Sequence, residues 1–362
     1  MSILRPLIQQ FIADFVEPAA GITLTASGST VTVETIEGVA SASIHLSYPL
    51  QGATAQLNQA LSDALQARGM QAIHIDITQQ ITSASSRQNL QSIPGIKNIL
   101  VVASGKGGVG KSTTAANLAL ALAHDGANVG LLDADIYGPS QARMMGLTGQ
   151  HPSSQDGKSF EPLNAYGIKV MSIGLLVDEE QPMVWRGPMV TQALTQLLND
   201  CRWGNLDYLV VDMPPGTGDI QLTLSQRVPI SGAVIVTTPQ DIALLDARKG
   251  LKMFEKVGVP VLGIVENMST HICSHCGHEE HVFGAGGGAR MAEQYHVDLL
   301  AELPLDIRIR EQADGGKPTV AHDPAGALAQ AYLSMARRTS ARLARHAVQS
   351  SKSMPTIVVE ET

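Results

Sequence analysis

The sequence has few cysteines, no excess of basic residues and no long apolar run, and each shortage excludes a class of protein. Three cysteines among 362 residues cannot form a disulfide framework, so a reducing cytoplasm is expected. A net charge of −8 lacks the basic character that nucleic-acid binding requires. No apolar stretch could span a bilayer, and residues 1–18 lack the apolar run of a signal peptide. We therefore expect a cytoplasmic protein with neither nucleic acid nor membrane among its partners.

The first part of the chain has the periodicities of a small α+β domain, which we place at residues 1–80. Apolar residues recur at helical spacing within 53–69 and alternate with polar residues within 41–48, as in a half-buried strand. Residues 71–77 predict another strand. No cluster of catalytic residue types occurs here, so this domain is interpreted as a docking or assembly module. Residues 81–96 are polar, rich in serine and contain Pro-Gly, which predicts a linker.

The pattern then changes to apolar runs that alternate with helical segments, over residues 97–340. The runs are NILVVAS, NVGLLDAD, DYLVVDMP, GAVIVTTP and PVLGIVENM. Continuous apolar strands separated by helices predict an α/β domain with a mostly parallel sheet covered by helices on both faces. A C-terminal tail is expected over residues 341–362. It contains too few large apolar residues for a strong membrane-surface helix, despite several arginines around position 340.

A phosphate-binding loop follows the first of these strands. The segment GKGGVGKST satisfies the pattern G-x-x-x-x-G-K-[ST], between a strand and a helix where that pattern belongs. Its glycines let backbone N–H groups turn toward phosphates, and the start of the helix favours anions. The predicted nucleotide-binding residues of the loop are Gly105, Lys106, Gly107, Gly108, Val109, Gly110, Lys111, Ser112 and Thr113. Lys111 should reach the terminal phosphates, and the Ser112 hydroxyl should bind Mg²⁺.

Polar residues follow three later strands at the ends where ligands bind open α/β sheets. Asp133 and Asp135 lie in LLDADIYGPS, and Asp212 and Gly216 lie in VVDMPPGTGD. Asp212 is expected to hold Mg²⁺ through water, with the Gly216 N–H near the γ-phosphate. Asn267 follows a further strand, and the GTPase signature N-K-x-D is absent, which favours ATP. Asp133 as a strand-end cap and Asn267 as a turn residue remain alternatives.

A second lysine in the loop, Lys106, produces the deviant sequence KGGVGKST, which resembles the MinD/ParA class of P-loop ATPases. The resemblance implies that Lys106 reaches the nucleotide of a partner subunit, and hence a homodimer. It also implies that Asp135 orients the attacking water, that Asp133 lies near Mg²⁺ and that Asn267 contacts adenine. Lys106, Lys111 and Asp135 are thus the expected catalytic residues.

Two cysteines three positions apart, Cys273 and Cys276, provide half of a metal site. A four-iron cluster needs four thiolates, which two chains would supply together. A zinc ion bridging two chains through four sulfurs is an alternative. Zinc held by both cysteines with His278 and His281 has tighter ligand spacing than finger-type sites, and a redox pair lacks the thioredoxin-like context. Cys201 lies apart from every motif and receives no function.

Taken together, the motifs resemble the Mrp/ApbC family of iron–sulfur cluster carrier ATPases. The resemblance covers about residues 95–320 and rests on GKGGVGKST, DADIYGPS, WRGPM, DMPPGTGD, TTPQDIAL and ENMSTHICSHCG. It implies slow ATP hydrolysis and a labile 4Fe–4S cluster that Cys273 and Cys276 hold across a dimer. Cluster donors and apo iron–sulfur proteins would be the partners.

Two interpretations stay open beside this one. The first is a MinD/ParA-like positioning or regulatory switch that carries structural zinc at the CxxC. The second concerns Trp185 and Arg186, which could contact nucleotide or a partner, or belong to a packed loop.

Overall fold

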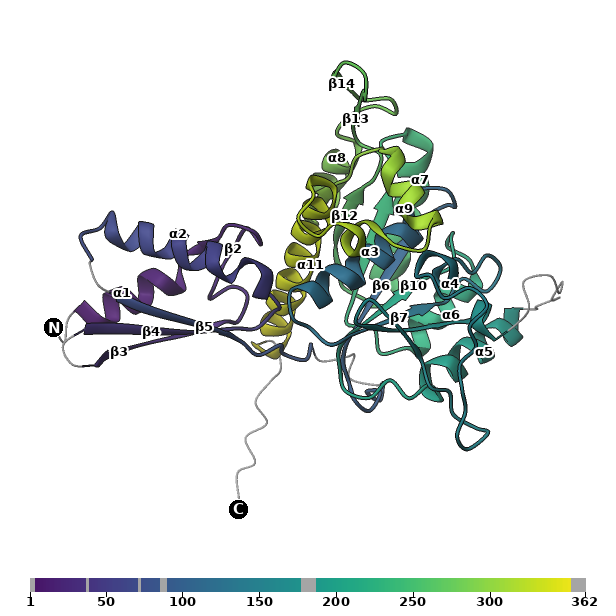
Figure 1. Ribbon diagram of the computed structural model, residues 1–362, viewed down its shortest axis with the longest axis horizontal. Coiled ribbons are helices and arrows are strands. Elements are labelled where there is room, and N and C mark those ends of the chain that lie inside the picture. The colour runs from purple at the N-terminus through teal and green to yellow at the C-terminus, as the bar shows by residue number, and fades with distance from the viewer. Residues whose placement is uncertain (1–3, 37–38, 71–72, 85–89, 177–186, 353–362) are drawn as a thin grey trace. The chain divides into compact units, whose positions relative to one another are not determined.

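The computed structural model divides the chain into two compact units. One unit combines Met1–Ser85 with Ser340–Thr362, and the other is Ser86–Thr339 (Figure 1). The structure describes residues 4–36, 39–70, 73–84, 90–176 and 187–352. No helix within these ranges is long and apolar enough to cross a membrane.

The smaller unit is an α+β structure built on a three-stranded sheet in the order β3-β4-β5. Strand β4 pairs antiparallel with β3 and parallel with β5. The inward residues of β4 are at most 1% exposed, which confirms the predicted alternation: Ala42, Ile44 and Leu46. Its elements are α1 (Leu4–Ala13), β1 (Val16–Glu17), β2 (Ile22–Thr23), β3 (Thr30–Ile36), β4 (Val39–Leu46), α2 (Thr54–Gln66) and β5 (Ile73–Gln79).

The larger unit contains an eight-stranded sheet in the order β15-β12-β11-β6-β10-β7-β9-β8. All neighbouring strands are parallel except the edge pair β8 and β9, which is antiparallel. The strands are β6 (Ile96–Ser104), β7 (Val129–Asp133), β8 (Leu163–Ala165), β9 (Ile168–Ser172), β10 (Leu206–Asp212), β11 (Gly232–Thr237), β12 (Val261–Glu266) and β15 (Leu299–Glu302). The predicted fold class is confirmed.

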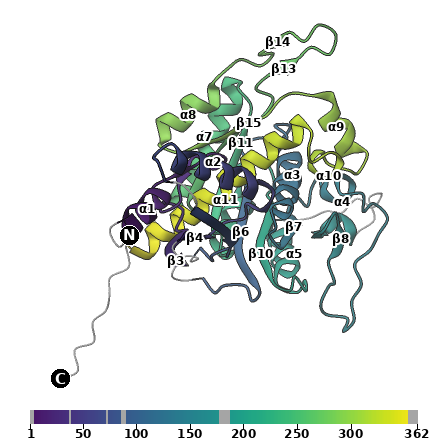
Figure 2. The ribbon, with the colours of Figure 1, turned by 60° about the vertical axis from the view of Figure 1, so that its left-hand side comes forward.

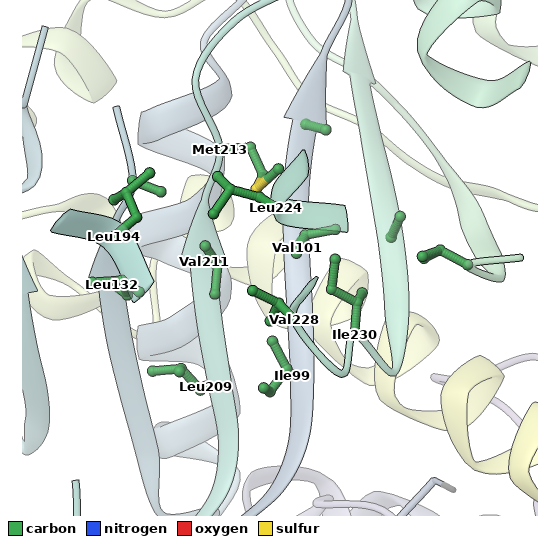
Figure 3. Packing of buried hydrophobic residues seen from close by; sticks show 14 of the residues in the cluster. Ile99, Val101, Leu132, Leu194, Leu209, Val211, Met213, Leu224, Val228 and Ile230 are labelled. Carbon is green, nitrogen blue, oxygen red and sulfur yellow. The ribbon is translucent and has the colours of Figure 1, made fainter. Parts of the chain in front are cut away.

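Helices cover both faces because the strands are apolar on both sides. On one face, alternate strand residues such as Val101 and Val211 pack against Leu194 of α5 and Leu224 of α6 (Figure 3). On the other face α3 packs against β6, β7 and β10. The helices of this unit are α3 (Lys111–His124), α4 (Gln141–Met144), α5 (Gly187–Asn199), α6 (Asp219–Arg227), α7 (Asp241–Lys256), α8 (Gly287–Tyr295), α9 (Ile307–Asp314) and α10 (Thr319–His322).

The last helix, α11 (Ala327–Lys352), continues past residue 340, where a tail was expected to begin. Arg337 in its first part forms a buried ion pair with Asp125, at 2.7 Å between Nε and Oδ2. Arg342 in its second part donates to the backbone oxygen of Ala20. These arginines are thus held by protein groups.

A small hairpin leaves the sheet after β12. Its strands are β13 (His271–Ile272) and β14 (Glu279–Glu280), which pair antiparallel over two residue pairs. Both ribbon views show it projecting beyond the ends of the larger strands and helices around it (Figure 1, Figure 2).

Candidate functional site

The glycine-rich loop joins β6 to the start of α3, and the backbone there requires glycine. Gly108 and Gly110 both have φ of +82°, a left-handed conformation that glycine adopts without strain. Space is limiting as well, because a Cβ on Gly110 would lie 2.1 Å from the Asn267 amide nitrogen. The loop therefore ends in a tight turn at Gly110, immediately before α3.

The remaining loop residues differ in their surroundings. A Cβ on Gly105 would lie 2.1 Å from the backbone of Asp246 in α7, so this glycine allows a close approach of helix and loop. Gly107 is exposed, and a Cβ on it would meet nothing within 4 Å. Lys106 and Thr113 are half-buried. The described part of the chain gives Lys106 no ion-pair partner.

Lys111 is buried and forms an ion pair with Asp212 at the end of β10. Its Nζ also lies 3.2 Å from the Ser112 hydroxyl. Gln141 completes the group, because its amide nitrogen donates to Asp212 Oδ2 at 2.8 Å and to the Ser112 carbonyl at 2.9 Å. The structure thus brings together three predicted residues, and it adds Gln141, which the sequence motifs did not indicate.

Asp133 lies beside Asp212 in the sheet register and is completely buried. Backbone N–H groups of Asp135, Ser140 and Gln141 donate to its carboxylate at 3.0–3.1 Å. Burial, and after it the nearby Asp212 charge, raise the pKa of Asp133 to about 7, while the donated hydrogen bonds and the Lys111 charge oppose the shift. Asp133 therefore organises the loop after β7, close to the predicted magnesium ligands.

Asp135 is half-buried in the same loop. Burial raises its pKa, and the Lys111 charge opposes that shift. This places Asp135 close enough to the lysine for their charges to interact.

Two predicted nucleotide contacts are engaged in hydrogen bonds with the protein. The Asn267 amide donates to the Val109 carbonyl at 2.9 Å. The Gly216 N–H donates to the Ser104 carbonyl at 3.0 Å. Both groups thus hold the edge of the phosphate loop in this arrangement, and contact with adenine or γ-phosphate stays a prediction for each.

The donor set fits a magnesium nucleotide. A hydroxyl from Ser112 and a carboxylate from Asp212 are hard oxygen ligands of the type that Mg²⁺ takes, and they meet at the start of α3. Lys111 lies between them. The open space over Gly107 and Gly108 leaves the loop backbone accessible to phosphates.

The two cysteines occupy the tip of the hairpin. Cys276 is exposed and Cys273 is partly exposed. Two backbone hydrogen bonds close the turn. The Cys273 N–H donates to the His278 carbonyl at 2.9 Å, and the Gly277 N–H donates to the Cys273 carbonyl at 2.9 Å. Backbone N–H groups of Cys276 and His275 donate to the Cys273 sulfur and lower its thiol pKa. The tip thus favours a thiolate.

Histidines of the same segment do not complete a site around the cysteines. His281 uses Nδ1 on the Ser269 carbonyl at 2.8 Å, and His271 uses Nδ1 on the Leu305 carbonyl at 3.0 Å. Across the described ranges, no group of three or more histidine, cysteine or carboxylate side chains could hold a metal ion. Zinc bound within one chain by Cys273, Cys276, His278 and His281 therefore finds no support in the structure.

Cys201 lies in the hydrophobic core of the larger unit, 6% exposed, beside residues such as Trp203. Burial raises the pKa of its thiol to about 12. Trp185 and Arg186 lie outside the described residues.

A glycine-rich loop between a central strand and a helix, with buried carboxylates at the ends of two neighbouring parallel strands, defines a P-loop NTPase. The family model described as "ParA: NUBPL iron-transfer P-loop NTPase" matches residues 95–340. The chain belongs to this family, as the resemblance in sequence predicted.

Individual relatives agree with this assignment. An iron–sulfur cluster carrier protein of Haemophilus influenzae is 51% identical over 93% of this chain and 91% of its own length. The iron–sulfur cluster transfer protein NUBPL of Mus musculus is 51% identical over 81% of this chain and 89% of its own length. A nucleotide-binding protein from Archaeoglobus fulgidus, solved with ADP, is 39% identical with a TM-score of 0.55, over 62% of this chain and 88% of that one.

Proposed function

We propose that the protein is an ATP-hydrolysing carrier that binds a labile 4Fe–4S cluster between two copies of the chain and transfers it to apoproteins. The observation that carries this proposal is the hairpin tip. It exposes two thiols, one of them biased toward thiolate, and the described part of the chain offers no third ligand nearby.

The cluster's coordination follows from that number of ligands. A 4Fe–4S cluster takes four thiolates, and each chain supplies Cys273 and Cys276. Two hairpins facing each other would complete the set. A cargo held at the exposed ends of two hairpins can be reached by an acceptor protein without opening the sheet. Cluster donors and apo iron–sulfur proteins are therefore the proposed partners.

The nucleotide half of the proposal uses the group around the phosphate loop. Ser112 and Asp212 would hold Mg²⁺, which neutralises phosphate charge when bound. Lys111 would leave Asp212 and reach the terminal phosphates. Asp135 would orient the attacking water. Lys106 would contact the nucleotide of the second copy, consistent with its lack of an ion-pair partner in the described ranges. Hydrolysis should be slow, because the site needs that second copy.

The proposal is tested by anaerobic reconstitution with iron and sulfide. We expect about four irons per two chains and the absorbance of a 4Fe–4S cluster. Cys273→Ser and Cys276→Ser should abolish binding. Cys201→Ser is the matched control, because this buried thiol should contribute nothing. A cluster-loaded monomer, loss of the cluster in Cys201→Ser, or exclusive binding of zinc would overturn the proposal.

A further inference from the structure

The last residue of β12, Glu266, is a buried carboxylate to which the sequence motifs give no role. Its side chain is 0% exposed, and it faces Gly288 at the start of α8. The Gly288 N–H donates to its Oε2. Its other oxygen, Oε1, has no hydrogen-bond partner among the described residues. The Gly286 N–H and the Arg290 charge also stabilise this carboxylate against the cost of its burial. Several groups that follow the hairpin therefore act on this one side chain.

The segment that Glu266 holds is the exit of the cysteine hairpin. The chain passes from β14 through the glycine-rich segment 284–288, GAGGG, into α8, which begins at Gly287. A Cβ on Gly288 would lie 2.9 Å from the Glu266 Cβ, and one on Gly287 would lie 2.9 Å from the Pro239 carbonyl. This exit is therefore fitted closely against the end of β12, and Glu266 supplies its hydrogen-bond acceptor.

The residue after Glu266, Asn267, contacts the phosphate loop. Asn267 donates to the Val109 carbonyl in the phosphate loop, and its amide nitrogen occupies the space that a Cβ on Gly110 would take. Two consecutive residues at the end of β12 thus contact two different sites, the phosphate loop and the cysteine hairpin. One fixes the phosphate loop and the other fixes the hairpin exit.

We propose that Glu266 is the positioning residue that couples the phosphate loop to the cysteine hairpin. A shift of the loop on nucleotide binding moves Asn267, and through the shared backbone it moves the carboxylate that anchors Gly288. The orientation of Cys273 and Cys276 then depends on the nucleotide. This inference rests on the proposed function for its purpose, but its test needs no cluster.

The test measures alkylation rates of Cys273 and Cys276 by peptide mass spectrometry on the full-length chain. Rates are compared without nucleotide, with Mg²⁺–ADP and with a slowly hydrolysed ATP analogue. A coupling of ordinary size should change the wild-type rates by about fivefold or more. Glu266→Ala should reduce that change to less than about twofold while nucleotide affinity, measured separately, stays near wild type.

Three further variants distinguish a loss of coupling from general damage to the fold. Glu266→Gln keeps an oxygen that can accept the Gly288 N–H, so it should retain most of the nucleotide dependence. Glu302→Ala is the matched control, because Glu302 lies beside Glu266 in the register of the neighbouring strand β15, but its side chain is exposed. It should behave like wild type. If Glu266→Ala does not fold, Glu266→Asp shortens the reach by one methylene and should also lose the dependence.

Nucleotide-independent rates in the wild type, or full dependence in Glu266→Ala, would overturn the inference. Failure of the proposed function has a different signature, because a chain that never binds a cluster can still show nucleotide-dependent thiol rates.

Discussion

Replacing Lys111 by methionine tests the central ion pair. Lys111 is 6% exposed and Asp212 is 0% exposed, so the substitution leaves a buried carboxylate without its cation. Breaking a buried pair in this way costs about 3–5 kcal/mol. For a domain of this size, about 2–4 °C is lost per kcal/mol, so the melting temperature without nucleotide should fall by about 6–20 °C.

The double variant Lys111→Met with Asp212→Asn isolates the electrostatic part. The asparagine oxygen can still accept from Gln141, and the uncompensated charge at position 212 is removed. Most of the lost stability should therefore return, while ATP hydrolysis stays absent in both variants. Thermal melts and phosphate release on matched preparations measure the two effects.

The pH dependence of the single variant has a definite sign. The pKa of Asp133 in the folded protein is raised to about 7, above its ordinary value, so the folded state binds the extra proton. Stability from this group is therefore lost as pH rises through about 7. Without Lys111 the loss should be larger at about pH 9 than at about pH 5. Equal melting temperatures for wild type and Lys111→Met, or no recovery in the double variant, would refute the reasoning.

Three other predictions follow from the site. Lys106→Ala should melt like wild type and retain nucleotide binding but lose turnover in an ATPase assay; normal hydrolysis would exclude a role across the dimer. Gly110→Ala should lose about 1–3 kcal/mol of stability from its strained backbone and from the contact with Asn267, whereas Gly107→Ala, with open space around it, should melt like wild type. Iodoacetamide near neutral pH should modify Cys273 and Cys276 well before Cys201, because burial raises the pKa of the Cys201 thiol to about 12; equal rates would contradict the burial of that residue.

Central strands could be predicted because each is a continuous apolar run. The five runs named from the sequence all became strands of the larger sheet, with the carboxylates of Asp133 and Asp212 at neighbouring ends. Strands β8, β9 and β15 were not predicted, since such short segments carry little periodic signal. Strand order likewise depends on contacts between distant segments, which the local pattern does not contain.

Some residues of the candidate site could likewise be identified from the sequence, and others only from the structure. Its motif residues could be named because phosphate binding constrains glycines, a lysine and a hydroxyl at fixed spacing. Gln141 and Glu266 could not, because each acts through a partner that only the folded sheet brings near: Asp212 for the first and Gly288 for the second. Asn267 was found by its place after a strand, but its bond to Val109 required the structure.

The anchoring of the hairpin at both ends has a consequence for engineering. Ser269, at its entry, donates to the Leu303 carbonyl, and Gly288, at its exit, donates to Glu266. Only two residue pairs join β13 to β14, so the excursion between these anchors contributes little to the sheet. We therefore expect that the hairpin can be removed without unfolding the larger unit. We expect that a short Gly-Ser turn could replace residues 271–283 and leave a folded, nucleotide-binding protein without cargo, and that the excised segment could be transplanted onto a related sheet.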